Sequence, residues 1–164
     1  MPSPRRILRA LRSVAAQTAR GAAAVCVAAM IGGGAHAGAA VPGAGPPPPA
    51  QPRRIVSLDY CADQFVLKFA DRAAIAGLSP DATADFSYMR DAAVGLPVVR
   101  PRTEDVLVLR PDLVVRSYGG GAGVGAQMAR AGVAVLNVGF AGGIADVRAT
   151  VLRMAAALGA PEAG

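Results

Sequence analysis

The stretch 103–115, TEDVLVLRPDLVV, constrains the fold more than any other part of the chain. Thr103 is a predicted N-cap, and the two acids after it suit the positive end of a first helical turn. Pro111 cannot continue such a helix and keeps Arg110 out of the α region, so we expect the helix to end there. The apolar run 113–115 then favours a buried strand. Helix, proline and strand together predict an α/β unit.

The net charge of +6 is distributed unevenly along the chain. Seven of the 17 Lys and Arg residues precede Ile55, and no Asp or Glu does. From Ile55 onward, 10 basic residues stand against 11 acidic ones. A nearly neutral body lacks the basic footprint of a nucleic-acid-binding protein, so we expect no nucleic-acid partner. The length of 164 residues, of which 53% are hydrophobic, suits one domain with its own core.

Residues 1–37 have the pattern of an export signal. A basic start, PRRILRALR, precedes an apolar core over 21–31 and the cleavage-like tripeptide Ala-His-Ala. The core is too short to span a bilayer comfortably, which favours a signal peptide over an N-terminal anchor. Cleavage would remove Cys26 and the single histidine, His36, and leave Cys61 as the one cysteine. We therefore expect an exported protein without an internal disulfide.

After a linker, the rest of the chain alternates between segments with the hydrophobic spacing of strands and segments with that of helices. The Pro/Gly-rich segment 38–53 predicts a disordered linker. Beyond it we expect strands over 55–58, 75–78, 112–116 and 133–138, and helices over 59–70, 103–110, 126–131 and 144–158. Gly132 and Gly159 are predicted helix stops, and Pro161 opens a further helix. This alternation predicts an α/β fold, a Rossmann-like parallel sheet flanked by helices.

Ligands of such sheets bind at the carboxyl ends of the strands. Three of the few aromatic residues, Tyr60, Tyr118 and Phe140, fall at these ends, and Phe86 and Tyr88 fall in a predicted loop or irregular helix. This placement predicts a contact surface for a flat or bulky ligand, with ordinary packing as the alternative.

The sequence offers no complete catalytic or metal-binding set. The glycine cluster 119–125 fits G-x-G-x-x-A, but the next strand ends without the acid that a dinucleotide site needs. Cys61 falls in a first helical turn, where a thiol can be activated, yet the mature chain would have no histidine to serve as its base. Histidine pairs and C-x-x-C motifs are absent from the sequence. We therefore expect no catalytic residues, no resident metal and no cofactor.

Taken together, several pieces resemble the N-terminal lobe of the periplasmic substrate-binding proteins of ABC importers for iron–siderophore complexes, haem and cobalamin. The pieces are RIVSLDYCADQFVL (54–67), IAGLS (75–79), TEDVLVLRPDLVV (103–115), AQMARAGVAVLNVG (126–139) and DVRATVLRMAAALGAPEAG (146–164). The resemblance implies two α/β lobes joined by one long helix, with the ligand between them. It assigns 54–159 to the N-terminal lobe and 160–164 to the start of the inter-lobe helix, with the C-terminal lobe absent.

The resemblance also implies partners and sites. The ligand would be a metal chelate, an iron–siderophore complex before cobalamin or haem, and the protein would pass it from the periplasm to an inner-membrane ABC permease. The implied ligand-binding residues are Asp59, Tyr60, Arg100, Arg102, Tyr118 and Gly119. Glu104 maps onto an acid that docks on the permease in that family, although it also suits the helix dipole as a first-turn acid.

Two other hypotheses remain open at the level of sequence. One is a small exported α/β enzyme that uses Cys61 or the glycine loop 119–125. The other is an inactive, truncated fragment that exposes the apolar surface a partner lobe would cover.

Overall fold

The computed structural model describes residues 45–118, 121 and 123–164. The predicted signal peptide, linker residues 38–44 and Gly119 lie outside the described residues. In chain order the elements are β1 (Ile55–Ser57), α2 (Tyr60–Phe69), η1 (Arg72–Ala74), β2 (Ile75–Gly77), α3 (Arg90–Ala93), α4 (Thr103–Val108), β3 (Leu113–Arg116), α5 (Val124–Arg130), β4 (Ala134–Asn137), α6 (Ile144–Ala157) and η2 (Pro161–Ala163).

The four strands form one sheet in the order β2-β1-β3-β4, and every pair is parallel. Beyond the end of β2, Leu78 and Val98 form a single parallel bridge. The α/β fold predicted from the sequence is therefore confirmed. The chain leaves β1 for β2 on one side and returns past β1 to β3 on the other. The gap between the carboxyl ends of β1 and β3 is thus the switch point at which such sheets hold ligands.

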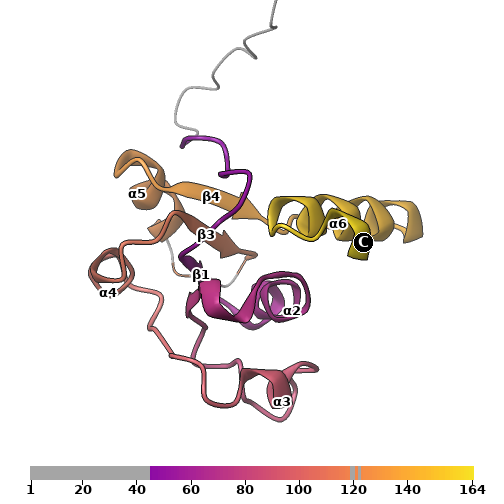
Figure 1. Ribbon diagram of the computed structural model, residues 1–164, viewed down its shortest axis with the longest axis horizontal. Helices are drawn as coiled ribbons and strands as arrows, with labels where there is room; N and C mark the ends of the chain where they lie inside the picture. The colour runs from indigo at the N-terminus through magenta and orange to yellow at the C-terminus, as the bar shows by residue number, and fades with distance from the viewer. Residues whose placement is uncertain (1–44, 119–120, 122) are drawn as a thin grey trace, which may run out of the picture. The chain divides into compact units, whose positions relative to one another are not determined.

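The sheet is buried on both faces because its residues alternate between two apolar clusters. Leu113 and Val115 of β3 belong to the cluster that α2 and α6 cover, and Val114 belongs to the cluster beneath α4 and α5. All three are fully buried. Figure 1 shows α2 and α6 on one side of the sheet and α4 and α5 on the other. Continuous β-branched runs are what a strand covered on both faces requires.

Four helices end in left-handed backbone, and three of them, α3 with Gly95 and the two named next, use glycine there. Gly132 (φ 77°) follows α5 and Gly159 (φ 93°) follows α6, and both stops were predicted. After α4 the same position is taken by Arg110, with φ 47°. Pro111 follows it and has no N–H to donate back to the helix. The helix therefore ends at Val108, two residues earlier than predicted.

The predicted N-cap of α4 is wrong. Arg102 occupies the cap position and makes no side-chain cap hydrogen bond, while Thr103 is the first helical residue. The Thr103 hydroxyl instead donates to Oε1 of Gln127 on α5. A tertiary contact between two helix starts has displaced the local cap.

Helix α6 buries only the carboxyl half of its predicted apolar stripe. Met154 and Leu158 are buried, whereas Ile144 is 87% exposed and Val147 is 47% exposed. None of the helices in the described ranges combines the length and hydropathy that a membrane span needs.

The amino edge of the sheet is clamped by Asp112. Its two carboxylate oxygens accept the backbone N–H groups of Arg53 and Arg54, at 2.8 and 3.0 Å. The guanidinium of Arg54 also donates from Nε and Nη2 to the carbonyl of Leu109, at 2.9 and 2.6 Å. These contacts fix the entry to β1 against the turn between α4 and β3.

Candidate ligand-binding edge

Asp59 ties together the two strand ends at the switch point. It is the N-cap of α2, and its Oδ1 accepts the backbone N–H of Ala62 at 3.0 Å. Its carboxylate also accepts two hydrogen bonds of 2.6 Å from Ser117, one from the backbone N–H and one from the hydroxyl. Asp59 is 6% exposed. This predicted ligand-binding residue is therefore engaged inside the protein, where it joins the end of β1 to the end of β3.

Asp63, one turn further along α2, makes the equivalent connection to β2. Its side chain is completely buried, and it accepts from the backbone N–H and the hydroxyl of Ser79 at 3.1 and 2.6 Å. Burial raises the pKa of Asp63 above the ordinary aspartate value, although the hydrogen bonds from Ser79 and Ser57 oppose the shift. Asp59 and Asp63 thus hold the ends of three strands against the start of one helix.

The predicted aromatic residues are exposed around the same edge. Tyr60 is 44% exposed and meets Phe86 edge to face, with ring centroids 5.3 Å apart and an interplanar angle of 82°. Tyr118 is 77% exposed at the end of β3, and Tyr88 and Phe140 are exposed as well. The hydrogen bond with the side chain of Cys61 raises the pKa of the Tyr60 hydroxyl above its ordinary value. These rings can stack on a ligand or donate neutral hydrogen bonds to it.

The predicted arginines lie at the start of α4. Arg100 and Arg102 are both exposed. Arg100 forms an ion pair with Asp105, with Nε 3.5 Å from Oδ2. Pro101 stands between Arg100 and Arg102, and its carbonyl oxygen would lie 2.5 Å from a Cβ added to Gly121. The glycine loop after β3 therefore packs directly on the arginine segment and requires a glycine to do so.

The predicted docking residue Glu104 follows in the first turn of α4. Its side chain is exposed, and no ion pair involves it in the described part of the chain. Because α4 leads into the amino end of β3, its own first turn lies towards the carboxyl edge of the sheet. Glu104 is therefore on the same side of the molecule as the exposed aromatic residues.

Cys61 is a free, half-buried thiol in the first turn of α2. No histidine lies within residues 45–164. No cluster of three or more potential metal ligands occurs among the described residues either. The arrangement at this edge accordingly offers stacking surfaces and cationic donors, which suit binding.

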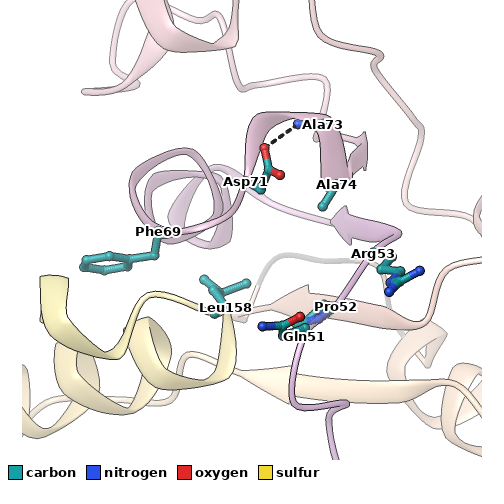
Figure 2. A pocket seen from close by; sticks show the side chains of 9 residues that line it. Gln51, Pro52, Arg53, Phe69, Asp71, Ala73, Ala74 and Leu158 are labelled. Atoms are coloured by element: carbon teal, nitrogen blue, oxygen red, sulfur yellow. Dashed lines mark hydrogen bonds between the residues drawn. The ribbon is translucent and has the colours of Figure 1, made fainter.

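A cavity of about 450 Å³ lies at the opposite, amino edge of the sheet. Figure 2 shows it between the end of α2, represented by Phe69, the end of α6, represented by Leu158, and the segment 51–53. Asp71 on its rim accepts the backbone N–H of Ala73 at 3.0 Å. Parallel α/β sheets bind ligands at the carboxyl edge, so we assign this cavity to imperfect packing between helix ends.

Sequence reasoning missed the roles of Asp63, Ser79 and Ser117, and it missed Arg116 altogether. Of these residues, Asp63 is the one that the sequence could have indicated. The signal that identifies it is its position between Ala62 and Val66, both of which are fully buried. A carboxylate on the buried stripe of a helix must find hydrogen-bond donors, and serines at neighbouring strand ends supply them.

Comparisons with known proteins show that the fold matches about one lobe of binding proteins. Neither the protein-family models nor the curated proteins that were searched match the sequence. Among solved structures, the periplasmic heme-binding protein BhuT, in complex with two hemes, matches with a TM-score of 0.51 and 31% identity over 69% of this chain and 43% of that chain. A periplasmic heme-binding protein from Pseudomonas aeruginosa matches with a TM-score of 0.53 and 23% identity, over 68% and 40%.

The vitamin B12-binding protein BtuF of Vibrio cholerae matches with a TM-score of 0.55 and 17% identity, over 70% of this chain and 45% of that one. This chain thus spans less than half the length of the structures it matches. The predicted resemblance to periplasmic haem-, B12- and iron-binding proteins is confirmed at the level of the fold. The matched region corresponds to about one lobe of those proteins.

Proposed function

We propose that this chain is the solute-binding component of an ABC importer. It captures a metal chelate in the periplasm, an iron–siderophore complex before cobalamin or haem, and delivers it to the permease in the inner membrane. The observation that carries the proposal is the carboxyl edge of the sheet. There, exposed aromatic rings lie near the strand ends and exposed arginines precede α4, in a fold that matches one lobe of binding proteins.

The exposed rings supply the apolar part of the proposed site. Tyr60 and Phe86 form one edge-to-face pair, and Tyr118 stands apart from them at the end of β3. A chelate is large and partly flat, and it gains binding energy by covering such rings. Arg100 and Arg102 supply charge for carboxylate or other anionic oxygen atoms of the chelate. In the proposed function, a second lobe closes over the ligand from the other side.

The proposal is tested by titrating the full-length protein with ferric siderophores, haem and corrinoids. Native mass spectrometry detects each complex directly, and quenching of tyrosine fluorescence reports on Tyr60, Tyr88 and Tyr118 together. We expect at least one metal chelate to bind in a one-to-one complex. Failure of every chelate to bind would remove the proposal.

Glu104 is proposed as the contact with the permease. We expect Glu104→Arg to leave chelate affinity unchanged and to abolish uptake in cells, because the substitution puts like charge against the basic docking surface of the permease. Glu162→Arg is the matched control, since it makes the same charge change at another exposed position, in η2. Normal uptake by the Glu104 variant would refute the docking role.

A further inference from the structure

A second cavity, of about 310 Å³, opens at the carboxyl edge between the ends of β3 and β4. It is lined by Arg116, Ser117, Tyr118, Asn137 and Gly139. Of the predicted ligand contacts that lie within the described residues, only Tyr118 lines it. The cavity therefore adds polar groups to the candidate edge that the sequence did not indicate.

Arg116 provides the charged wall of this cavity. Its Nε donates to the carbonyl of Ser117 at 3.2 Å, and its guanidinium lies across Gly125 of α5, so that Arg116 also lines an adjoining cavity of about 390 Å³ beside Pro46 to Pro48. A Cβ added to Gly125 would come within 2.8 Å of Arg116 Nη1, so the absence of a side chain on α5 makes room for the arginine. Within the described ranges, Arg116 forms no ion pair with a carboxylate. Its side chain is half-buried, which positions the guanidinium while leaving the charge uncompensated.

A second guanidinium reinforces the positive charge at this end of the sheet. Arg153 of α6 donates from Nη1 to the carbonyl of Asn137 at 2.9 Å and from Nη2 to the carbonyl of Val138 at 2.7 Å. These bonds hold the end of β4 as the chain turns at Gly139, where φ is 82°. Arg153 is thus a positioning residue for the cavity wall.

The nearest carboxylates do not line the cavity. Asp59 accepts both hydrogen bonds from Ser117, and Asp146 accepts the backbone N–H of Gly142 at 3.0 Å. Because the hydroxyl hydrogen of Ser117 is directed to Asp59, its oxygen can act towards the cavity only as an acceptor. The donors that remain for a ligand are the Arg116 guanidinium, the Asn137 amide and the Tyr118 hydroxyl.

We propose that this cavity binds an anionic oxygen group, a carboxylate or a phosphate, carried by the ligand, and that Arg116 is its principal contact. A planar guanidinium matches the two oxygens of such a group, and the amide of Asn137 adds a neutral donor. The inference rests on the proposed function and extends it, because it selects chelates with a free acidic group over those without one.

The test compares Asn137→Asp with the unmodified full-length protein. The substitution puts a carboxylate into the cavity and leaves the packing of Arg116 on Gly125 in place. Two pairs of probes differ in their free carboxylates. One pair is haem with haem dimethyl ester, and the other is ferric citrate with ferrioxamine B. Cobalamin is the probe that carries a phosphate group. Affinities are measured by calorimetry, and Arg130→Ala, an exposed arginine outside the cavity, is the matched control.

We expect Asn137→Asp to lower the affinity for the acidic probes at least tenfold and to change the affinity for the other probes by less than twofold. Arg116→Lys should lower the affinity for the acidic probes in the same selective way, because lysine keeps the charge but lacks the paired N–H donors of the guanidinium. Equal losses for both members of each pair, or no loss, would overturn the inference while binding itself upheld the proposed function.

A chelate-free measurement separates the two proposals. Citrate and inorganic phosphate are titrated into the unmodified protein while the backbone amide signals of Asn137 and Gly139 are followed by NMR. Shifts that disappear in Asn137→Asp would support the anion site even if no chelate bound. An absence of shifts with both anions, together with no discrimination among the chelates, would overturn it.

Discussion

The two halves of the carboxyl edge use their polar groups in opposite ways. On the α2 side, Asp59 and Asp63 turn inward and are bonded to Ser117 and Ser79. On the β4 side, Arg116 and its neighbours line an open cavity. The acidic half holds strand ends together, and the basic half offers donors to solvent.

The difference follows from the size and solvation of the two kinds of side chain. A short carboxylate at a strand end cannot reach water, so it must be satisfied where it lies. No buried side-chain nitrogen or oxygen in the described ranges lacks a hydrogen-bond partner. Arginine has a long stem that packs against the protein while its charged group stays available. A charged residue at a strand end is therefore a better candidate ligand contact if it is basic.

The largest expected effect comes from breaking the acidic half. We expect Asp59→Ala to lower the free energy of unfolding by about 3 kcal/mol, because it removes a helix cap and leaves two donors of Ser117 without an acceptor. Urea denaturation followed by circular dichroism measures the loss.

Asp71→Ala is the control for that substitution. Asp71 also caps a helix, η1, but it is exposed and serves only Ala73. Its loss should cost about 1 kcal/mol. Equal losses for the two variants would show that the connection between β1 and β3 adds no stability.

An intermediate effect is expected at the junction of the glycine loop with the arginine segment. Gly121→Ala should cost about 2 kcal/mol, because it combines left-handed backbone with a clash on the Pro101 carbonyl. Gly132→Ala has nearly the same backbone, with φ 77° against 78°, and no atom within 4 Å of its added Cβ. It should cost about 1 kcal/mol. Thermal unfolding of both variants measures the difference, and equal values would mean that the loop does not press on Pro101.

The smallest effect concerns the pH dependence of stability at Asp63. Because burial raises the folded-state pKa of this acid, the folded protein binds its proton more tightly than the unfolded chain does. The stability that Asp63 contributes is therefore present below the unfolded pKa, about 4, and declines as pH rises through the folded pKa. In Asp63→Asn this decline is absent. As pH rises from about 4 towards neutrality, the free energy of unfolding of the unmodified protein should fall relative to that of the variant. Parallel curves of unfolding free energy against pH would contradict the prediction.

The fold was predictable because its signals are local. The apolar run 113–115, the stop at Pro111 and the glycines after α5 and α6 each act within a few residues. The α/β arrangement and the strand-end position of the aromatic residues followed from them. The predicted signal peptide and the predicted linker over 38–53 stay predictions. The same holds for every site assignment, namely Asp59, Tyr60, Arg100, Arg102, Tyr118, Gly119 and Glu104.

What escaped prediction depends on tertiary contacts. Thr103 was expected to cap its own helix, and its hydroxyl instead contacts Gln127 on α5. Ile144 continues the apolar stripe of α6 but extends past the sheet and remains exposed. Arg116 ends a strand like many other arginines, and its importance rests on the space that Gly125 leaves beside it. None of these three outcomes is contained in the spacing of residues along one element.

The clamp at Asp112 determines where a mechanical load enters the molecule. A pull on the proline-rich segment passes through the backbone of Arg53 and Arg54 to Asp112, at the start of β3. Strands of three or four residues are about 10 Å long, and they separate this anchor point from the carboxyl edge. The same segment also lies beside the opposite edge, because Pro46 to Pro48 line a cavity together with Arg116 and Asn137, so tension in it acts on both edges of the sheet.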